Sequence, residues 1–192
     1  MGWFDFLFGK RHKPEDSDAA AMERLHQILS QGRSTTDHLG PAAIAGHAAK
    51  AAIKERRFDD AWRLYHEQKQ HYMLHANSSG FTGRQALELD ASVHSNLANI
   101  RRLEQKHDDA LVHLLYAANS TSRPTKDLPK KVNAYFNRCK FKYTLAADVL
   151  SFIELNRQKP NFRLVQTTVV SWRNREQLPN NSFKPKPLRG SA

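Results

Sequence analysis

The chain has 192 residues, of which 40% are hydrophobic and 26% are charged, so we expect a buried core and exclude a wholly disordered protein. Its single cysteine, Cys139, excludes an internal disulfide framework and a cysteine-based zinc cluster. Residues 1–121 hold 15 Lys/Arg and 15 Asp/Glu, whereas residues 122–192 hold 15 Lys/Arg and 4 Asp/Glu, so the net charge of +11 lies entirely in the last third. This distribution favours an anionic partner; the alternative is that it only keeps a helical protein soluble.

The N-terminal segment, residues 1–17, is amphipathic, aromatic and basic, and it ends in a linker. It lacks the cleavage site of a signal peptide, and no apolar run in the chain reaches the roughly 20 residues that span a bilayer, so we expect a cytoplasmic protein. Aromatic rings beside a cationic cluster also suit the inner face of an anionic membrane. The alternative is that the rings pack into a groove of this protein or of a partner. The expected membrane contacts are Trp3, Phe4, Leu7, Phe8, Lys10 and Arg11.

A helical domain is predicted over residues 18–176, because apolar residues recur three and four positions apart through most of it. The predicted helices cover residues 19–29, 41–55, 58–74, 85–105, 108–119, 128–143 and 145–155. Acidic pairs, Asp59-Asp60 and Asp108-Asp109, stand at two of the helix starts, where they complement the helix dipole. Residues 162–176 fit a helix by apolar spacing and a strand by their β-branched side chains. Residues 177–192 are basic and contain prolines, and we expect flexible tails at both ends.

Two segments share a pattern that a plain succession of helices does not require. Ala49 precedes Ala61 by 12 positions, and Ala98 precedes Ala110 by the same number. Each later alanine follows an Asp-Asp pair and is followed, four positions on, by a large side chain, Tyr65 or Leu114.

This pattern resembles the tetratricopeptide repeat, in which small residues stand where two helices cross. The resemblance covers about residues 41–122, in units of about 41–76 and 84–122, and its spacing of 49 residues departs from the family's 34. It implies an all-α fold of antiparallel helix-turn-helix pairs stacked as a short array. The basic helices predicted over 128–176 follow this array. A generic antiparallel helical bundle is the alternative, and it is all-α as well.

The resemblance also implies a function, because the concave face of such a stack normally binds an extended peptide or a helix of another protein. The first hypothesis is therefore a non-catalytic adaptor that binds another protein through a groove. An ordinary solvated face is the alternative interpretation of each groove residue. The expected groove residues are Lys50, Lys54, Asn96, Asn99 and Arg102.

The second hypothesis is RNA or DNA binding through the basic and aromatic region 130–175. The predicted helix over 128–143 places an apolar stripe, Val132, Phe136, Cys139 and Tyr143, beside a basic stripe. Phosphates would meet the basic residues while Tyr135 or Phe141 stacks on bases; the simpler interpretation is a core with a solvated rim. A peripheral membrane protein anchored by residues 2–13 is a third, weaker hypothesis. The expected contacts to an anionic partner are Lys130, Lys131, Tyr135, Arg138, Lys140, Lys142, Arg173 and Arg175.

Catalytic and metal-binding signals are weak in this sequence. His71 and His75 have the i, i+4 spacing of a metal pair, but no carboxylate ligand or HExxH motif accompanies them, so we expect no metal site. Cys139 lies on an apolar stripe, which predicts an inert core thiol. Without a nucleophile elbow, a Walker loop or a dinucleotide fingerprint, we expect no enzymatic activity and no cofactor. The sequence predicts neither the identity of the partner nor the oligomeric state.

Overall fold

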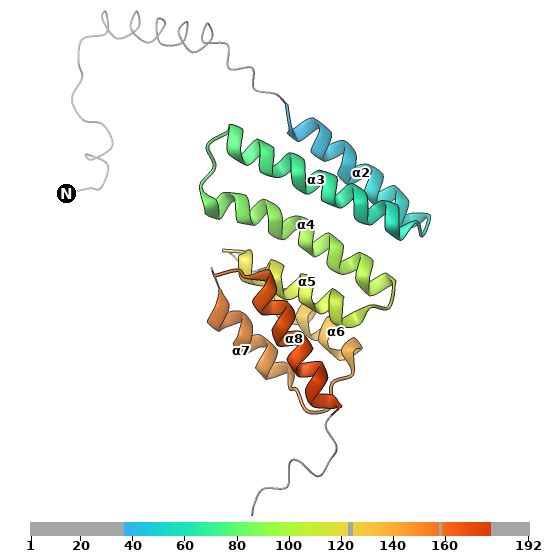
Figure 1. Cartoon of the computed structure of the whole chain (residues 1–192), viewed down its shortest axis with the longest axis vertical. Coiled ribbons are helices and arrows are strands. Elements are labelled where there is room, and N and C mark those ends of the chain that lie inside the picture. The colour runs from blue at the N-terminus through green and yellow to red at the C-terminus, as the bar shows by residue number, and fades with distance from the viewer. Residues whose placement is uncertain (1–36, 123–124, 158, 178–192) are drawn as a thin grey trace, which may run out of the picture. The chain divides into compact units, whose positions relative to one another are not determined.

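The computed structural model describes residues 37–122, 125–157 and 159–177. Within these residues the chain forms seven α-helices and no strand. The prediction of an all-α fold is confirmed (Figure 1). The helices are α2 (Leu39–Lys54), α3 (Phe58–Ser78), α4 (Gly83–Leu103), α5 (His107–Ser120), α6 (Leu128–Cys139), α7 (Ala146–Asn156) and α8 (Phe162–Glu176). The predicted N-terminal segment, the predicted helix at 19–29 and all of the predicted tail except Gln177 lie outside the described residues.

The described helices belong to one compact unit in which neighbours in sequence are neighbours in space (Figure 1). Helices α2, α3, α4 and α5 each pack against the next, and α6, α7 and α8 all pack against α5. Residues 110–120 of α5 are all buried, so this helix is covered on every side. A helix that is buried around its whole circumference occupies a central position in the fold.

The turns that end α2 and α4 have the same geometry. Arg56 has a φ of 61°, and the N–H of Arg57 donates at 2.8 Å to the carbonyl five residues earlier. Gln105 has a φ of 64°, and the N–H of Lys106 donates at 2.9 Å to the carbonyl five residues earlier. A left-handed residue with this long-range bond is the Schellman arrangement that closes a helix. The two turns are 105 − 56 = 49 residues apart, which is also the spacing of the two Asp-Asp-Ala motifs.

Small side chains stand at both helix pairs that these turns join. Ala49 and Ala61 belong to a core group between α2, α3 and α4, and Ala98 and Ala110 to a larger group around α5. All four are at most 1% exposed. A methyl group at such positions lets two helix backbones approach closely.

Residues 162–176, which the sequence left between helix and strand, form helix α8. Val165, Val169 and Trp172 recur at i, i+4 and i+7, and all three are buried. The side chain of Asn161 accepts a hydrogen bond from the N–H of Leu164 at 3.0 Å and so caps the first turn. Burial of one apolar stripe outweighs the β-propensity of the valines.

The helix predicted over 128–143 is too long, because α6 ends at Cys139. Lys140 adopts the left-handed conformation with a φ of 54°, and the backbone N–H groups of Lys142 and Tyr143 donate at 2.7 and 2.9 Å to the carboxylate of Glu176. Glu176 lies at the end of α8, so a distant helix fixes this turn. Lys142 and Tyr143 therefore do not continue the basic and apolar stripes of α6.

Candidate functional site

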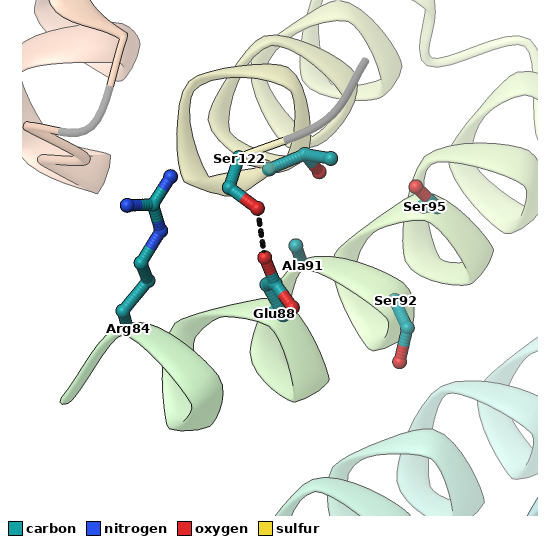
Figure 2. Close-up of a pocket in the computed structure, with 7 residues that line it drawn as sticks. Arg84, Glu88, Ala91, Ser92, Ser95 and Ser122 are labelled. Carbon is teal, nitrogen blue, oxygen red and sulfur yellow. Dashed lines mark hydrogen bonds between the residues drawn. The ribbon is translucent and has the colours of Figure 1, made fainter. Parts of the chain in front are cut away.

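A polar trough crosses one face of α4. It consists of two hollows, of about 340 Å³ and about 600 Å³, that share Ser92. The first hollow lies between α2, α3 and α4 and is lined by Ala43, Gly46, His47, Lys50, Tyr65, Gln68, Tyr72, Ser92 and Asn96. The second hollow lies between α4 and the end of α5 and is lined by Arg84, Glu88, Ala91, Ser92, Ser95, Thr121 and Ser122 (Figure 2). We call the two together the α4 trough.

The floor of the first hollow depends on a glycine. A Cβ at Gly46 would lie 2.4 Å from the amide nitrogen of Gln68, so only glycine lets this side chain sit against α2. Gln68 is buried, and its amide donates to the hydroxyl of Tyr72 at 3.2 Å. Polar atoms are thus held in fixed positions beneath Lys50 and Asn96.

The structure brings two of the five predicted groove residues together. Lys50 of α2 and Asn96 of α4 line the same hollow. Lys54 is exposed near the end of α2 and does not line it. Asn99 accepts hydrogen bonds from the guanidinium of Arg102 at 2.7 and 3.2 Å, so these two side chains bind one another beyond the hollow.

The charges in the trough are mostly positive and unneutralised. Among the described residues, Lys50 and Arg84 form no ion pair. Glu88, on the same face, accepts a hydrogen bond from the hydroxyl of Ser122, and the two side chains point toward one another in Figure 2. The trough therefore offers two cations, one carboxylate and several hydroxyl and amide groups to a ligand.

The basic region supplies a second candidate surface. Between residues 125 and 177, 11 Lys/Arg face 4 Asp/Glu, an excess of 11 − 4 = 7. The four carboxylates have partners, Asp127 with Lys130, Glu154 with Arg157, and Asp148 and Glu176 with backbone N–H groups. The exposed cations among the predicted contacts are Lys130, Lys131, Arg138, Lys140 and Lys142.

Two members of the predicted anionic-partner site have structural roles instead. Tyr135 is buried in the core, 7% exposed, so its ring is not available to stack on a base. The guanidinium of Arg173 donates to both carboxylate oxygens of Asp108, at 2.6 and 2.7 Å, and to the carbonyl of Cys139 at 2.7 Å. It also lies 4.5 Å from the centre of the Phe141 ring, so it joins α8 to α5 and to the end of α6. Arg175 is half-buried.

A network of buried polar groups between α3, α4 and α5 is the feature that sequence reasoning missed. The ammonium of Lys69 lies 2.7 Å from Asp90, and Asp90 also accepts a hydrogen bond from the hydroxyl of Tyr116 at 2.7 Å. Behind them, the Nδ1 atoms of His94 and His113 lie 3.1 Å apart. The bonds between helices join residues 19 to 26 positions apart, which no local spacing connects. Asp90 and His94, which lie 3.7 Å apart, are four positions apart on α4. Polar residues on the inner faces of predicted helices were the available signal.

The histidine pair and the cysteine have ordinary structural surroundings. His71 packs against His38, whereas His75 packs against Phe81. No group of three or more His, Cys, Asp or Glu side chains is placed to hold a metal ion within the described ranges. Cys139 is buried, and burial, followed by the neighbouring Asp108, raises the pKa of its thiol to about 12. A thiol with so high a pKa is not a nucleophile near neutral pH.

The expected membrane contacts, Trp3, Phe4, Leu7, Phe8, Lys10 and Arg11, lie outside the described residues. In the described part, no helix is both long enough and apolar enough to cross a bilayer.

Comparison of the chain with protein-family models, with curated proteins and with solved structures gives no match. The resemblance to the tetratricopeptide repeat therefore rests on residues of this chain alone.

Proposed function

We propose that the chain is a non-catalytic adaptor that binds an extended segment of another protein along the α4 trough. The observation that carries the proposal is that Lys50 and Asn96, chosen from the repeat pattern on two separate helices, line one hollow, which shares Ser92 with a second hollow. An extended peptide needs such a row of hydrogen-bonding side chains across successive helices. The tetratricopeptide-like pattern of residues 41–122 supports the same interpretation.

The charge of the trough indicates the chemistry of the bound segment. Lys50 and Arg84 stand in different hollows and have no acidic partner among the described residues, so acidic side chains in the bound segment would complement both. Ser92, Ser95 and Asn96 lie on one face of α4 between them and supply donors and acceptors to a peptide backbone.

The proposal is tested by selecting peptides from a random displayed library on the full chain and measuring their affinities for variants. We expect Lys50→Glu and Asn96→Ala to weaken binding by about tenfold or more each, since each removes a polar contact to the bound segment. Lys54→Glu is the matched control, because Lys54 is exposed on the same helix and does not line the hollow. Equal affinities of the selected peptides for the original chain and for all three variants would contradict the proposal.

Nucleic-acid binding is the second candidate function, and the five exposed cations among its predicted contacts favour it. Titration of a fluorescent single-stranded RNA and of a duplex DNA at several salt concentrations tests it, because each neutralised phosphate adds to the salt dependence. A steep slope and submicromolar affinity near physiological salt, both lost in Lys131→Glu/Arg138→Glu/Lys140→Glu, would promote this candidate over the adaptor. Weak binding that disappears at moderate salt would exclude it.

A further inference from the structure

A third cavity, of about 520 Å³, opens between α3, α4, α5 and α8. Its α4 residues, His94 and Arg101, are two and nine positions from Ser92, which at 100° per residue places them on the opposite side of the helix from the trough. We call this cavity the histidine pocket. Its polar lining comes mainly from His66, Lys69, His94, Arg101, His113 and Tyr116.

The hydrogen bonds in this pocket fix the tautomers of two histidines. An ammonium can only donate, so Lys69 donates to Nε2 of His94, 3.3 Å away. The proton of neutral His94 is therefore on Nδ1, from which it is donated to Nδ1 of His113 at 3.1 Å. The proton of His113 must then be on Nε2, at the other edge of its ring. Asp90 anchors this chain by its 2.7 Å contact with Lys69.

The Nε2–H group of His113 has no hydrogen-bond acceptor among the described residues. Its ring lines the pocket and is held between Trp62 and Phe162, with ring centres 5.4 and 5.2 Å away. The side chain is only 8% exposed, so water reaches this donor only through the pocket. In the pocket this donor meets only solvent, and a ligand oxygen would take the place of that water.

Two cations, Lys69 and Arg101, line the pocket near this donor. Burial is the largest cause that lowers the pKa of His113, and the positive charges of Arg101 and Lys69 lower it further. Burial, Lys69 and Arg101 likewise lower the pKa of His66, and Asp90 only partly opposes them. Both cations have acidic partners, since Lys69 lies 2.7 Å from the buried Asp90 and Arg101 donates to Glu104 at 2.8 Å. Asp109 lines the pocket as an exposed carboxylate.

We propose that the histidine pocket binds the oxyanion of a small ligand, a carboxylate or a phosphate, through the Nε2–H of His113 and the ammonium of Lys69. His66 lies at the same pocket from the adjacent turn of α3 and adds a third nitrogen to the ligand's surroundings. The cavity volume is within the range of small-molecule sites, so the oxyanion belongs to a molecule of modest size. This inference is independent of the proposed function, because the trough lies on the other side of α4.

The test is a titration of the full chain with inorganic phosphate and, separately, with acetate, at constant ionic strength set by chloride. The imidazole nitrogens are followed by two-dimensional NMR, which reports Nε2 and Nδ1 of each histidine. We expect a saturable shift at Nε2 of His113 with one of the two anions and no such shift at His47, which is exposed in the trough. Saturation by phosphate alone identifies a phosphate site, and saturation by acetate alone identifies a carboxylate site.

Two variants of His113 distinguish the loss of its Nε2–H donor from a general effect on the fold. His113→Asn places its oxygen near the position of Nδ1, so it can still accept from His94, but it has no donor near Nε2. His113→Gln keeps a donor near that position. We expect the first to weaken anion binding about tenfold or more and the second to weaken it less. Equal affinities for the original chain and for both variants, or shifts that grow without saturation and match those in chloride alone, would overturn the proposal.

Discussion

A pair of buried histidines makes the stability of this protein sensitive to acid. Burial lowers the pKa of His94 to about 4 and that of His113 to about 3, from the usual 6.5. Between pH 6.5 and 4 the unfolded chain therefore binds protons that the folded chain excludes, and stability falls as the pH falls. Each such proton contributes a slope of about 1.4 kcal/mol per pH unit.

We therefore predict that the free energy of unfolding by urea decreases from pH 7 to pH 4 more steeply for the original chain than for His113→Asn. His47→Gln is the control, because His47 is exposed, and its slope should equal that of the original chain. Parallel curves for the original chain and His113→Asn would show that His113 does not exclude its proton on folding.

Arg173 is predicted to stabilise the fold rather than to bind a partner. Its guanidinium makes three hydrogen bonds, two of them to Asp108, which no other side chain can reproduce. Arg173→Gln should lower the free energy of unfolding by about 1–2 kcal/mol, a value reduced for partial solvent exposure. Arg175→Gln, two positions away, should change it little, because the side chain of Arg175 makes no hydrogen bond or ion pair with the described residues. Equal effects of the two substitutions in urea unfolding would show that the hydrogen bonds of Arg173 do not stabilise the fold.

At the scale of elements, the helix pairs depend on small residues where the sequence repeats. Ala61→Leu and Ala110→Leu would insert three carbons where the alanines are at most 1% exposed. We expect each to destabilise the fold by about 1–3 kcal/mol or more, because the helices must separate. Ala51→Leu, on an exposed position of α2, should cost within about 0.5 kcal/mol. Thermal unfolding measures the stability of all three variants. Unchanged stability of Ala61→Leu and Ala110→Leu would contradict the close contact between helices at these alanines.

The repeated turns give a prediction in the stabilising direction. Arg56 and Gln105 both have left-handed backbones, which a residue with a Cβ adopts at a cost. Arg56→Gly and Gln105→Gly should each stabilise the protein by about 0.5–1 kcal/mol, after the entropy that glycine adds to the unfolded chain. The two increments should be similar because the turns are similar. Opposite signs in urea unfolding would mean that the two turns differ in solution.

Sequence periodicity was sufficient to predict the helices but not the turns and side-chain contacts that join them. Apolar spacing placed α2 to α7 within a few residues, because burial of one stripe both forms and limits a helix. The break after Cys139 was missed, since Glu176, 34 positions from Lys142, holds the turn. The histidine pocket was missed for the same reason, because its donors come from three helices. Of the predicted groove residues, Lys50 on α2 and Asn96 on α4 line the same hollow, whereas Asn99 and Arg102 bind one another.

At the scale of the whole molecule, the described helices do not divide into independent repeats. In a regular stack each unit contacts only its neighbours, so a shortened array still folds. Here α5 closes the second helix pair and is also the helix against which α6, α7 and α8 pack. Leu111 and Leu115 of α5 belong to the core group that includes Val132, Val149 and Val165 from those three helices. Removing the last three helices would expose the far side of α5.

We therefore predict that a fragment of residues 37–122 does not fold as a stable monomer, although it contains both repeat-like units. Leu111 and Leu115 alone would lose about 1.5–3 kcal/mol each of burial, a large part of the stability of a domain this size. Circular dichroism with thermal unfolding, together with sedimentation, measures the outcome, and a fragment of residues 37–177 is the matched control. We expect the shorter fragment to unfold without cooperativity or to associate. A monomeric 37–122 fragment with a cooperative transition would show instead that the two helix pairs form a self-sufficient array, to which α6, α7 and α8 are an addition.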